Sequence, residues 1–281
     1  MYEVIFLWAL ALVYLIFAVV QDLRTREIAN WISFSLIIFA LGFRFFYSLF
    51  AKGEFSFFYQ GLIGLGIFFV LGNLFYYGKV FAGGDAKIMI ALGTILPISP
   101  FFLLNVQNFF NFLLVFLLAG FLYILIASTV LCIKNFKKFR KEFAKQIKKN
   151  KIFIIGIISL STIFLLLGFV NILFFFFGLI FSFTYFLFLY SKTIDEVCMV
   201  RQIQTKHLRE GDWLYADLRM GKNVIKANWD GLTKEDIKQI RKKFGKIKIR
   251  QGIPFSPNFL ISFIIFILLT IFHLNLWNPF G

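Results

Sequence analysis

The chain has 281 residues, of which 60% are hydrophobic and 43 are Phe, and its formal net charge is +16. A mean hydropathy of +0.82 excludes a water-soluble globular protein and is typical of a chain with several membrane-spanning helices. The positive charge indicates attraction to anionic lipid headgroups rather than nucleic-acid binding, because no nucleic-acid-binding motif accompanies it.

Eight apolar segments are long enough to cross a bilayer, since a spanning helix needs about 20 mostly apolar residues. They lie near residues 4–20, 31–50, 57–77, 86–105, 108–132, 152–169, 172–190 and 257–276. The fourth is the weakest, because Gly93, Pro97 and Pro100 interrupt it, so we expect it to stop short or kink and the next helix to begin before residue 108. The first segment lacks a basic leader and a small-residue cleavage site, which favours a helix over a signal peptide.

The distribution of Lys and Arg predicts the orientation, because cytoplasmic loops carry these residues in excess. An N-terminus on the outside places the loops at 21–30, 78–87, 133–151 and 191–256 in the cytoplasm. Roughly 28 of the 30 basic residues then lie at that face, with Arg44 and Lys52 on or near the other. We therefore expect a multi-pass protein of the plasma membrane.

The second half of the chain predicts two features beside membrane helices. Residues 133–151 place apolar side chains at helical spacing among lysines, which indicates an amphipathic helix on the inner leaflet, with a partner-docking helix as the alternative. Residues 191–254 predict a small α+β domain inserted before the last helix. Its expected parts are a strand in "DWLYADLRM", a turn at Gly221 and Lys222, a strand in "NVIKANW", a helix with a capping box from Thr233 to Asp236, and a strand in "KIKIRQG".

Two carboxylates stand out at the ends of apolar segments. Asp22 lies in "QDLRTREIANW", where the first span ends, and Asp85 lies in "FAGGDAKIMI", where the fourth begins. Two crossings separate them, so both are expected at the same face of the membrane. Two neighbouring carboxylates cannot both ionise cheaply, so one can activate a water molecule while the other donates a proton to a substrate carbonyl. The glycines before Asp85, Gly83 and Gly84, would let a substrate backbone approach.

Each of these carboxylates also has a structural interpretation. An aspartate at a helix start is a common N-cap, and Asp22 could pair with Arg24 or Arg26 at the interface. The functional interpretation gains from the two residues together, because carboxylates at the membrane edge are costly and usually serve function.

The two motifs together resemble the GxGD aspartyl proteases that process type IV prepilins and archaeal preflagellins. The resemblance implies that Asp22 and Asp85 are catalytic, that Gly83 and Gly84 are the motif glycines, and that Lys87 is a motif position without an assigned role. A lysine that snorkels to lipid headgroups is the alternative for Lys87.

The resemblance extends to other parts of the chain and has two departures. The segments "GLTKEDIKQIRKKF" and "IRQGIPFSPNFLISF" resemble the cytoplasmic segment and the final helix of archaeal members. Ala82 replaces the first motif glycine, and Ala29 stands where a Pro often precedes the Asn; neither change affects a carboxylate.

The resemblance implies a membrane aspartic endopeptidase that removes the leader from prepilin- or preflagellin (archaellin)-like precursors at the cytoplasmic boundary, without a cofactor or metal. The bacterial branch adds a cysteine-quartet zinc domain and a methylation activity. This chain has only Cys132 and Cys198, so the resemblance implies peptidase activity alone. The presenilin-like branch expects a Tyr-Asp pair and a Pro-Ala-Leu motif, which this chain lacks in suitable positions.

The domain organisation that follows comprises five regions. They are catalytic membrane helices at 1–132, a basic amphipathic loop at 133–151, a membrane hairpin at 152–190, the α+β domain at 191–254 and a final helix at 255–281. The α+β domain could hold the basic part of a precursor through Asp212, Asp217 and Asp230, although a solvated charged face is the alternative.

Two other classes of function stay open from the sequence. One is an ion- or proton-coupled transporter that uses the aspartates as a relay, although both lie at helix ends and no internal repeat is visible. The other is a membrane scaffold whose basic inner domain recruits partners.

Overall fold

The structure is a computed structural model that describes residues 2–52, 55–220, 223–228, 231–274 and 276. The chain divides into two compact units. Unit 1 comprises Met1–Ile124 and Pro254–Gly281, and unit 2 comprises Leu125–Ile253. Helix α5 (Phe102–Lys134) runs from one unit into the other.

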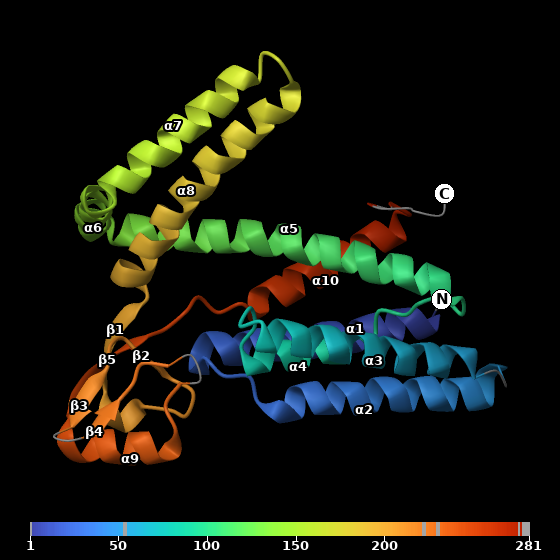
Figure 1. Ribbon diagram of the computed structural model, residues 1–281. Helices are drawn as coiled ribbons and strands as arrows, with labels where there is room; N and C mark the ends of the chain where they lie inside the picture. The colour runs from blue at the N-terminus through green and yellow to red at the C-terminus, as the bar shows by residue number, and fades with distance from the viewer. Residues whose placement is uncertain (1, 53–54, 221–222, 229–230, 275, 277–281) are drawn as a thin grey trace. The chain divides into compact units, whose positions relative to one another are not determined.

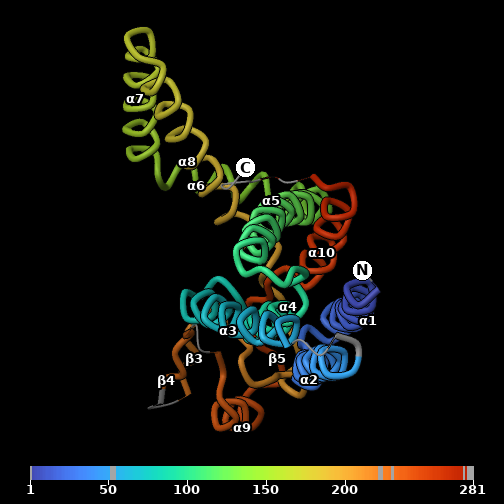
Figure 2. Tube along the Cα trace, turned by 90° about the vertical axis from the view of Figure 1, so that its right-hand side faces the viewer, coloured from blue at the N-terminus to red at the C-terminus, as the bar shows by residue number. Residues whose placement is uncertain are grey.

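Unit 1 is a bundle of helices (Figure 1). Besides the first part of α5, its elements are α1 (Tyr2–Thr25), α2 (Asn30–Tyr47), the π-helical turn η1 (Ser48–Lys52), α3 (Ser56–Tyr77), α4 (Gly83–Leu92) and α10 (Ser256–Ile271). Helix α4 packs between α2 and α3, while α1 packs on α2 and α10, as the turned view in Figure 2 shows. The short helix α4 is therefore the centre of the bundle.

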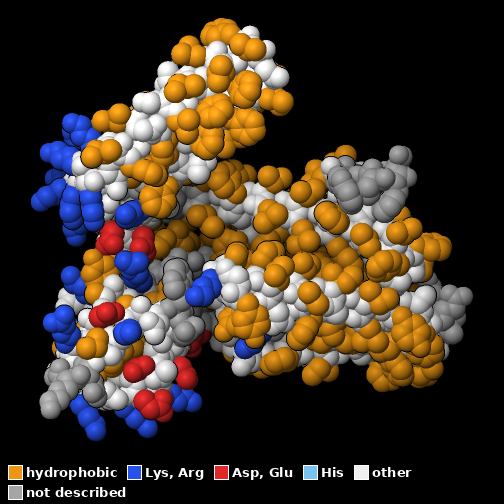
Figure 3. Space-filling model, in the orientation of Figure 1, with side chains coloured by type: hydrophobic (Ala, Val, Ile, Leu, Met, Phe, Trp, Pro, Cys, Tyr) orange, Lys and Arg blue, Asp and Glu red, His pale blue; other side chains and the backbone are white. Residues whose placement is uncertain are grey.

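The helices are those of a membrane protein. Five of those described are long and apolar enough to cross a bilayer by length and composition: α1, α2 with η1, α3, α5 and α8 (Ile172–Cys198). A sixth span results if the bent pair α6 (Phe136–Lys149) and α7 (Lys151–Leu167) is counted as one, and α10 is a shorter apolar helix. On the face drawn in Figure 3, hydrophobic side chains cover the helices of unit 1.

The fourth predicted span is shorter than its expected range of 86–105. Helix α4 ends at Leu92, the following residues 93–101 form no regular helix, and α5 already begins at Phe102. The expectation of an early stop and an early start of the next helix is thus confirmed, whereas the boundary at residue 105 is wrong. Gly93 and the two prolines in this segment disfavour continuation of the helix.

A buried asparagine fixes the segment between α4 and α5. The Asn105 side-chain oxygen accepts hydrogen bonds from the backbone N–H groups of Ile98 and Ser99, each at 3.0 Å. Its amide nitrogen donates to the Ser99 carbonyl at 2.7 Å and to the Gln60 side-chain oxygen at 2.9 Å. A single side chain thereby satisfies polar groups that could find no water within a bilayer.

Glycines allow α3 and α4 to approach closely. A Cβ atom on Gly64 would lie 2.2 Å from the Gly93 carbonyl oxygen, and one on Gly72 would lie 2.7 Å from the Ile90 side chain. Small residues at a helix interface are the usual way in which membrane helices gain van der Waals contact. Close contact with the backbone of α3 therefore helps to hold the short helix α4 in the bundle.

Unit 2 contains the end of α5, the helices α6, α7 and α8, and a small domain with strands. The elements of that domain are β1 (Val200–Gln204), η2 (Thr205–His207), β2 (Trp213–Leu214), β3 (Leu218–Met220), β4 (Asn223–Ile225), α9 (Lys234–Lys243) and β5 (Lys246–Arg250). Helices α7 and α8 pack side by side, and α6 packs on α8. The predicted amphipathic helix is confirmed as α6, where basic side chains gather in Figure 3, and α6 and α7 meet at a bend of 79°.

The strands form two antiparallel sheets, one of order β1-β5-β2 and one of the hairpin β3-β4. The hairpin between "DWLYADLRM" and "NVIKANW" is confirmed, as is the strand at "KIKIRQG". The single strand expected over 212–220 is wrong, because β2 pairs with β5 while β3 pairs with β4, so the chain changes sheets between them. The predicted turn at Gly221 and Lys222 lies outside the described residues.

The predicted helix α9 begins with the capping box that the sequence indicates. The Thr233 hydroxyl accepts from the Asp236 N–H at 3.2 Å, and the Asp236 carboxylate accepts from the Thr233 N–H at 3.0 Å. This reciprocal pair satisfies two of the N–H groups that every helix start leaves without an internal partner.

An ionic cluster joins the end of α8 to the larger sheet. Arg250 of β5 contacts Asp195 at 2.8 Å and Glu196 at 3.2 Å, and the Tyr215 hydroxyl donates to Glu196 at 2.8 Å. The hydrogen bond to Glu196 and the negative charge of that carboxylate raise the pKa of Tyr215. These contacts fix the strand domain to the helix that precedes it.

Candidate active site

Asp22 lies in the last turn of α1, where the backbone leaves the helix in a left-handed conformation. Arg26 has a φ angle of 61°, and its N–H donates to the Asp22 carbonyl at 2.8 Å. This bond is the helix-ending motif in which a left-handed residue satisfies a carbonyl of the last turn. A left-handed arginine is unfavourable compared with glycine, so the turn that presents Asp22 is a strained one.

Asp85 lies at the N-terminus of a helix, in the first turn of α4. Ala82 is the N-cap, and the Asp85 carboxylate accepts a hydrogen bond from the Ala82 N–H. The side chain therefore reaches back as the third-position residue of a capping box does. Because Ala82 has no side-chain acceptor, only this half of the box is formed.

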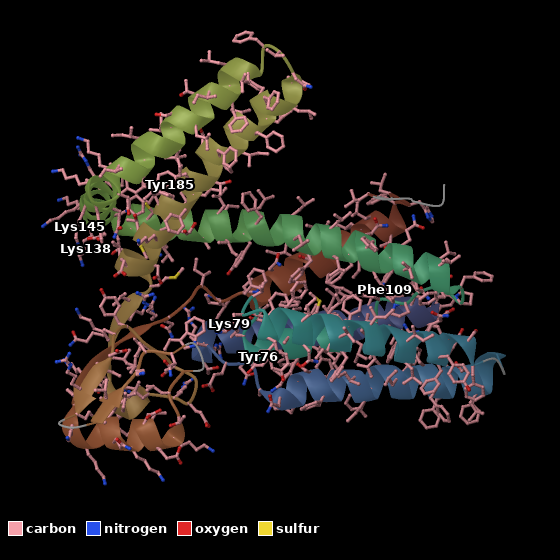
Figure 4. All side chains as sticks on the ribbon, viewed as in Figure 1. Tyr76, Lys79, Phe109, Lys138, Lys145 and Tyr185 are labelled. Atoms are coloured by element: carbon pink, nitrogen blue, oxygen red, sulfur yellow. The ribbon has the colours of Figure 1, made fainter. Side chains whose placement is uncertain are left out.

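The turn before Asp85 is also strained. Lys79, with a φ angle of 61°, follows α3, and the N–H groups of Lys79 and Val80 donate to the carbonyls of Tyr76 and Phe75 at 3.0 and 2.9 Å. This bonding is a Schellman motif with lysine in the position that glycine usually takes. Figure 4 shows Tyr76 and Lys79 at this turn. Arg26 and Lys79 are two of the three described non-glycine residues with positive φ.

The fold brings the two carboxylates together. Asp22 and Asp85 are each only 8% exposed, and the charge of Asp22 acts on Asp85. The N-terminus of α10 closes the site from a third side, where the Ser256 N–H donates to the Asp22 carboxylate at 3.4 Å. Two acids that are 63 positions apart by their numbering thus share one buried location.

The two sequence motifs are joined by a direct hydrogen bond as well. The Lys87 ammonium donates to the Asn30 side-chain oxygen at 2.6 Å, which links α4 to the first residue of α2. The Lys87 residue is half-buried. Its hydrogen bond to Asn30 therefore connects the two sequence segments that carry the carboxylates.

Comparison with known proteins addresses the same part of the chain. The type IV leader peptidase family matches residues 9–128, a range that includes both carboxylates and the AGGDAK motif. Residues 9–128 are therefore similar to the type IV leader peptidase family. The chain is also similar to the preflagellin peptidase of Methanococcus maripaludis, with 36% identity over 83 residues. That similarity covers 30% of this chain and 35% of the relative, so the chain spans about a third of that protein. No solved structure matches.

Within the matched region the two motif glycines have different surroundings. A Cβ atom on Gly84 would meet the Ile28 side chain at 3.1 to 3.5 Å, whereas one on Gly83 would meet only a Tyr76 ring carbon at 3.7 Å. Gly84 therefore lets α4 pack against the loop that follows Asp22. At Gly83 a Cβ atom would make only an ordinary van der Waals contact with Tyr76, so among the described residues no close neighbour requires glycine there.

An aromatic cluster lines the start of α4 and the start of α10. The Phe81 ring contacts Phe116 at 5.8 Å, Phe255 at 6.0 Å and Phe259 at 5.9 Å between ring centroids. Phe81 and Phe255 directly precede Ala82 and Ser256, the residues that donate to the two carboxylates. The cluster thus fixes the two backbone donors that reach Asp22 and Asp85 from one apolar core.

Sequence reasoning missed three residues around the carboxylates: Tyr123, Ser256 and Asn30. Tyr123 lies within electrostatic reach of Asp22, and Ser256 and Asn30 bond to Asp22 and Lys87. Two of them had a signal, since Asn30 stands in the first motif and Ser256 in the segment "IRQGIPFSPNFLISF". Tyr123 lies in an ordinary apolar context, and no spacing in the sequence relates Tyr123 or Ser256 to Asp22.

Acidic residues elsewhere have local partners. Asp217 accepts a hydrogen bond from the Ala227 N–H, and Asp212 accepts one from the Arg209 N–H, both at 2.8 Å. Asp230 lies outside the described residues. Among the residues that the structure describes, no group of three or more His, Cys, Asp and Glu could hold a metal ion.

Proposed function

We propose that the chain is a membrane aspartic endopeptidase that cleaves the leader from prepilin- or preflagellin (archaellin)-like precursors. The observation that carries the proposal is the pair of buried carboxylates, Asp22 and Asp85, within the region that matches the leader peptidase family. The name of the similar archaeal protein supports a precursor of the preflagellin class as substrate.

The chemistry requires the two acids in different protonation states. One carboxylate takes a proton from water as the water oxygen attacks the scissile carbonyl carbon, while the other carboxyl group donates its proton to the carbonyl oxygen. The tetrahedral intermediate then collapses as the C–N bond breaks: the leaving nitrogen takes the proton that the first carboxylate received from water, and a hydroxyl group of the intermediate returns a proton to the second carboxylate. Burial beside a second carboxylate favours this shared proton, because two charges in one apolar site are costly.

The proposed reaction occurs at the cytoplasmic boundary of the plasma membrane. Helices α2 and α3 separate Asp22 from Asp85, and two crossings return the chain to the face from which it started. The excess of lysine and arginine expected on that face supports a cytoplasmic location for the site. A precursor with a charged leader and an apolar helix would then present its cleavage point where lipid ends.

The surrounding residues receive roles in this scheme. Gly83 lets the substrate backbone approach Asp85, Gly84 permits close packing beside Asp22, and Lys87 holds the two motifs in register through Asn30. The proposal requires neither cofactor nor nucleic acid. It assigns no substrate contact to Asp212 or Asp217, since each carboxylate accepts a backbone hydrogen bond within the strand domain.

The decisive experiment is co-expression with a candidate precursor. We expect a shortened product in the membrane fraction, and N-terminal sequencing should place the cut between the charged leader and the apolar helix. A precursor that stays full length, although both proteins are present in the membrane, would argue against the proposal.

The two glycines offer a separate prediction. Gly84→Ala is expected to lower the melting temperature, because its methyl group must displace Ile28, whereas Gly83→Ala should leave stability near wild type. The Gly83→Ala variant should raise KM at the same time, because its methyl group would occupy the space that the substrate backbone enters in the proposed mechanism. Thermal unfolding in detergent and cleavage kinetics measure the two effects. A stable and fully active variant at both positions would contradict these roles.

A further inference from the structure

A hydrogen bond from the far end of the chain reaches one of the two acids. Ser256 is the first residue of the 16-residue helix α10, and its N–H donates to the Asp22 carboxylate with an N–O distance of 3.4 Å. The carboxylate therefore faces the positive end of the helix dipole. No comparable donor from α10 reaches Asp85 among the described hydrogen bonds.

The same serine carries a second donor that is not in use. The Ser256 side chain is completely buried, and its hydroxyl has no hydrogen-bond partner among the described residues. An unsatisfied buried hydroxyl costs on the order of 1–3 kcal/mol, so its presence beside a buried carboxylate requires an explanation. Alanine would fill this position without that cost.

Three contacts hold the segment in front of Ser256 in place. The Tyr123 hydroxyl of α5 donates to the Pro254 carbonyl at 2.7 Å, and the Phe255 ring contacts Phe116 at 5.7 Å. Just beyond, the Asn258 amide nitrogen donates to the Phe116 carbonyl at 3.1 Å. The start of α10 is thus fixed to α5, and Tyr123 itself lies within electrostatic reach of Asp22.

We propose that residues 254–256, which we call the α10 strap, and Tyr123 position the Asp22 carboxylate for proton transfer. The Ser256 N–H orients the carboxylate, the buried Ser256 hydroxyl is a second donor that becomes engaged when substrate and water occupy the site, and Tyr123 holds the strap through the Pro254 carbonyl. This inference rests on the proposed function. It makes Ser256 and Tyr123 positioning residues, which act on the substrate only through Asp22.

The test uses full-length variants in membranes with a precursor that the wild type cleaves. Ser256→Ala removes the hydroxyl but keeps the N–H, and Tyr123→Phe removes only the bond to the strap. Each is expected to lower kcat roughly 10- to 100-fold with KM changed less than about twofold, because misorientation of a reacting group slows the reaction without weakening binding. The double variant should cost little more than either single one, since both act on one element.

Matched controls separate positioning from general damage. Ser262→Ala removes a buried hydroxyl of the same helix that bonds to Asn258 at 3.2 Å, and Tyr185→Phe removes a buried phenol of α8. Both controls should keep wild-type kcat. Thermal unfolding is measured for every variant, and Tyr123→Phe decides the test if Ser256→Ala fails to fold.

The outcomes distinguish the strap from the proposed function. Wild-type kcat in folded Tyr123→Phe and Ser256→Ala overturns the strap, as does an equal loss of kcat in the Ser262→Ala control. An Asp22→Asn variant that still cleaves would instead defeat the peptidase assignment itself. Inactive Asp22→Asn together with normal strap variants defeats the strap alone.

Discussion

An Asp85→Asn variant is expected to lose cleavage while keeping its fold. The amide has the shape of the carboxyl group, and its oxygen can still accept the Ala82 N–H at the start of α4. It cannot take up and return a proton, however, and general acid–base catalysis contributes roughly 10²- to 10⁴-fold to a reaction rate. We therefore expect kcat to fall by at least about 10³-fold, measured as precursor conversion in isolated membranes.

Asp22→Asn should have an effect of the same size, because the two acids act as one unit. The double variant is expected to be no worse than either single variant, as is usual for residues that share a catalytic step. Glu210→Gln is the matched control, since Glu210 is an exposed carboxylate whose contact with Lys234 at 3.6 Å is weak. Substantial turnover in either Asp→Asn variant, with an active control, would contradict the dyad.

Much of the helical architecture could be predicted from the sequence, for a simple physical reason. An apolar run of about 20 residues forms a helix in lipid, because only a helix satisfies all backbone N–H and C=O groups within one segment. Helices α1, α2, α3, α5 and α8 therefore follow from composition alone. The capping box of α9 was equally local, since its two partners are three residues apart. The expectation that Asp22 and Asp85 lie at the same face required only two crossings between them, whereas their proximity depends on how α1 and α4 pack in the bundle.

Features that depend on distant contacts could not be predicted. The segment "VRQIQ" becomes strand β1 only by pairing with β5, whose partner residues are 42 to 50 positions away by their numbering. The residues around Asp22 likewise come from α5 and α10, and nothing in the local sequence of Tyr123 or Ser256 relates either residue to a carboxylate at the end of α1.

The burial of Arg44 could not be predicted either. The sequence indicates a cation on or near the outer face, whereas the side chain is completely buried in the structure. Its guanidinium lies 4.2 Å from the Phe57 ring centroid and donates to the Phe57 carbonyl at 2.8 Å. Its other donors reach carbonyls in the segment after α4, which are those of Thr94 at 2.8 Å, Ile95 at 3.4 Å and Pro97. A cation at this end also complements the dipole of α4.

Replacing Arg44 by methionine is consequently expected to destabilise the protein by about 3 kcal/mol or more. Methionine fills most of the volume but leaves buried carbonyls without donors, and each such group costs on the order of 1–3 kcal/mol. Arg44→Lys should have an intermediate effect, because one ammonium group cannot reach all of the carbonyls that the guanidinium N–H groups reach along its edges. Thermal unfolding in detergent and protease sensitivity of residues 93–101 measure the loss, with the exposed Arg219→Met as control. An Arg44→Met variant as stable as wild type would contradict this role of Arg44. The carbonyls after α4 would then have other hydrogen-bond donors, and glycine packing alone would hold α4 between α2 and α3.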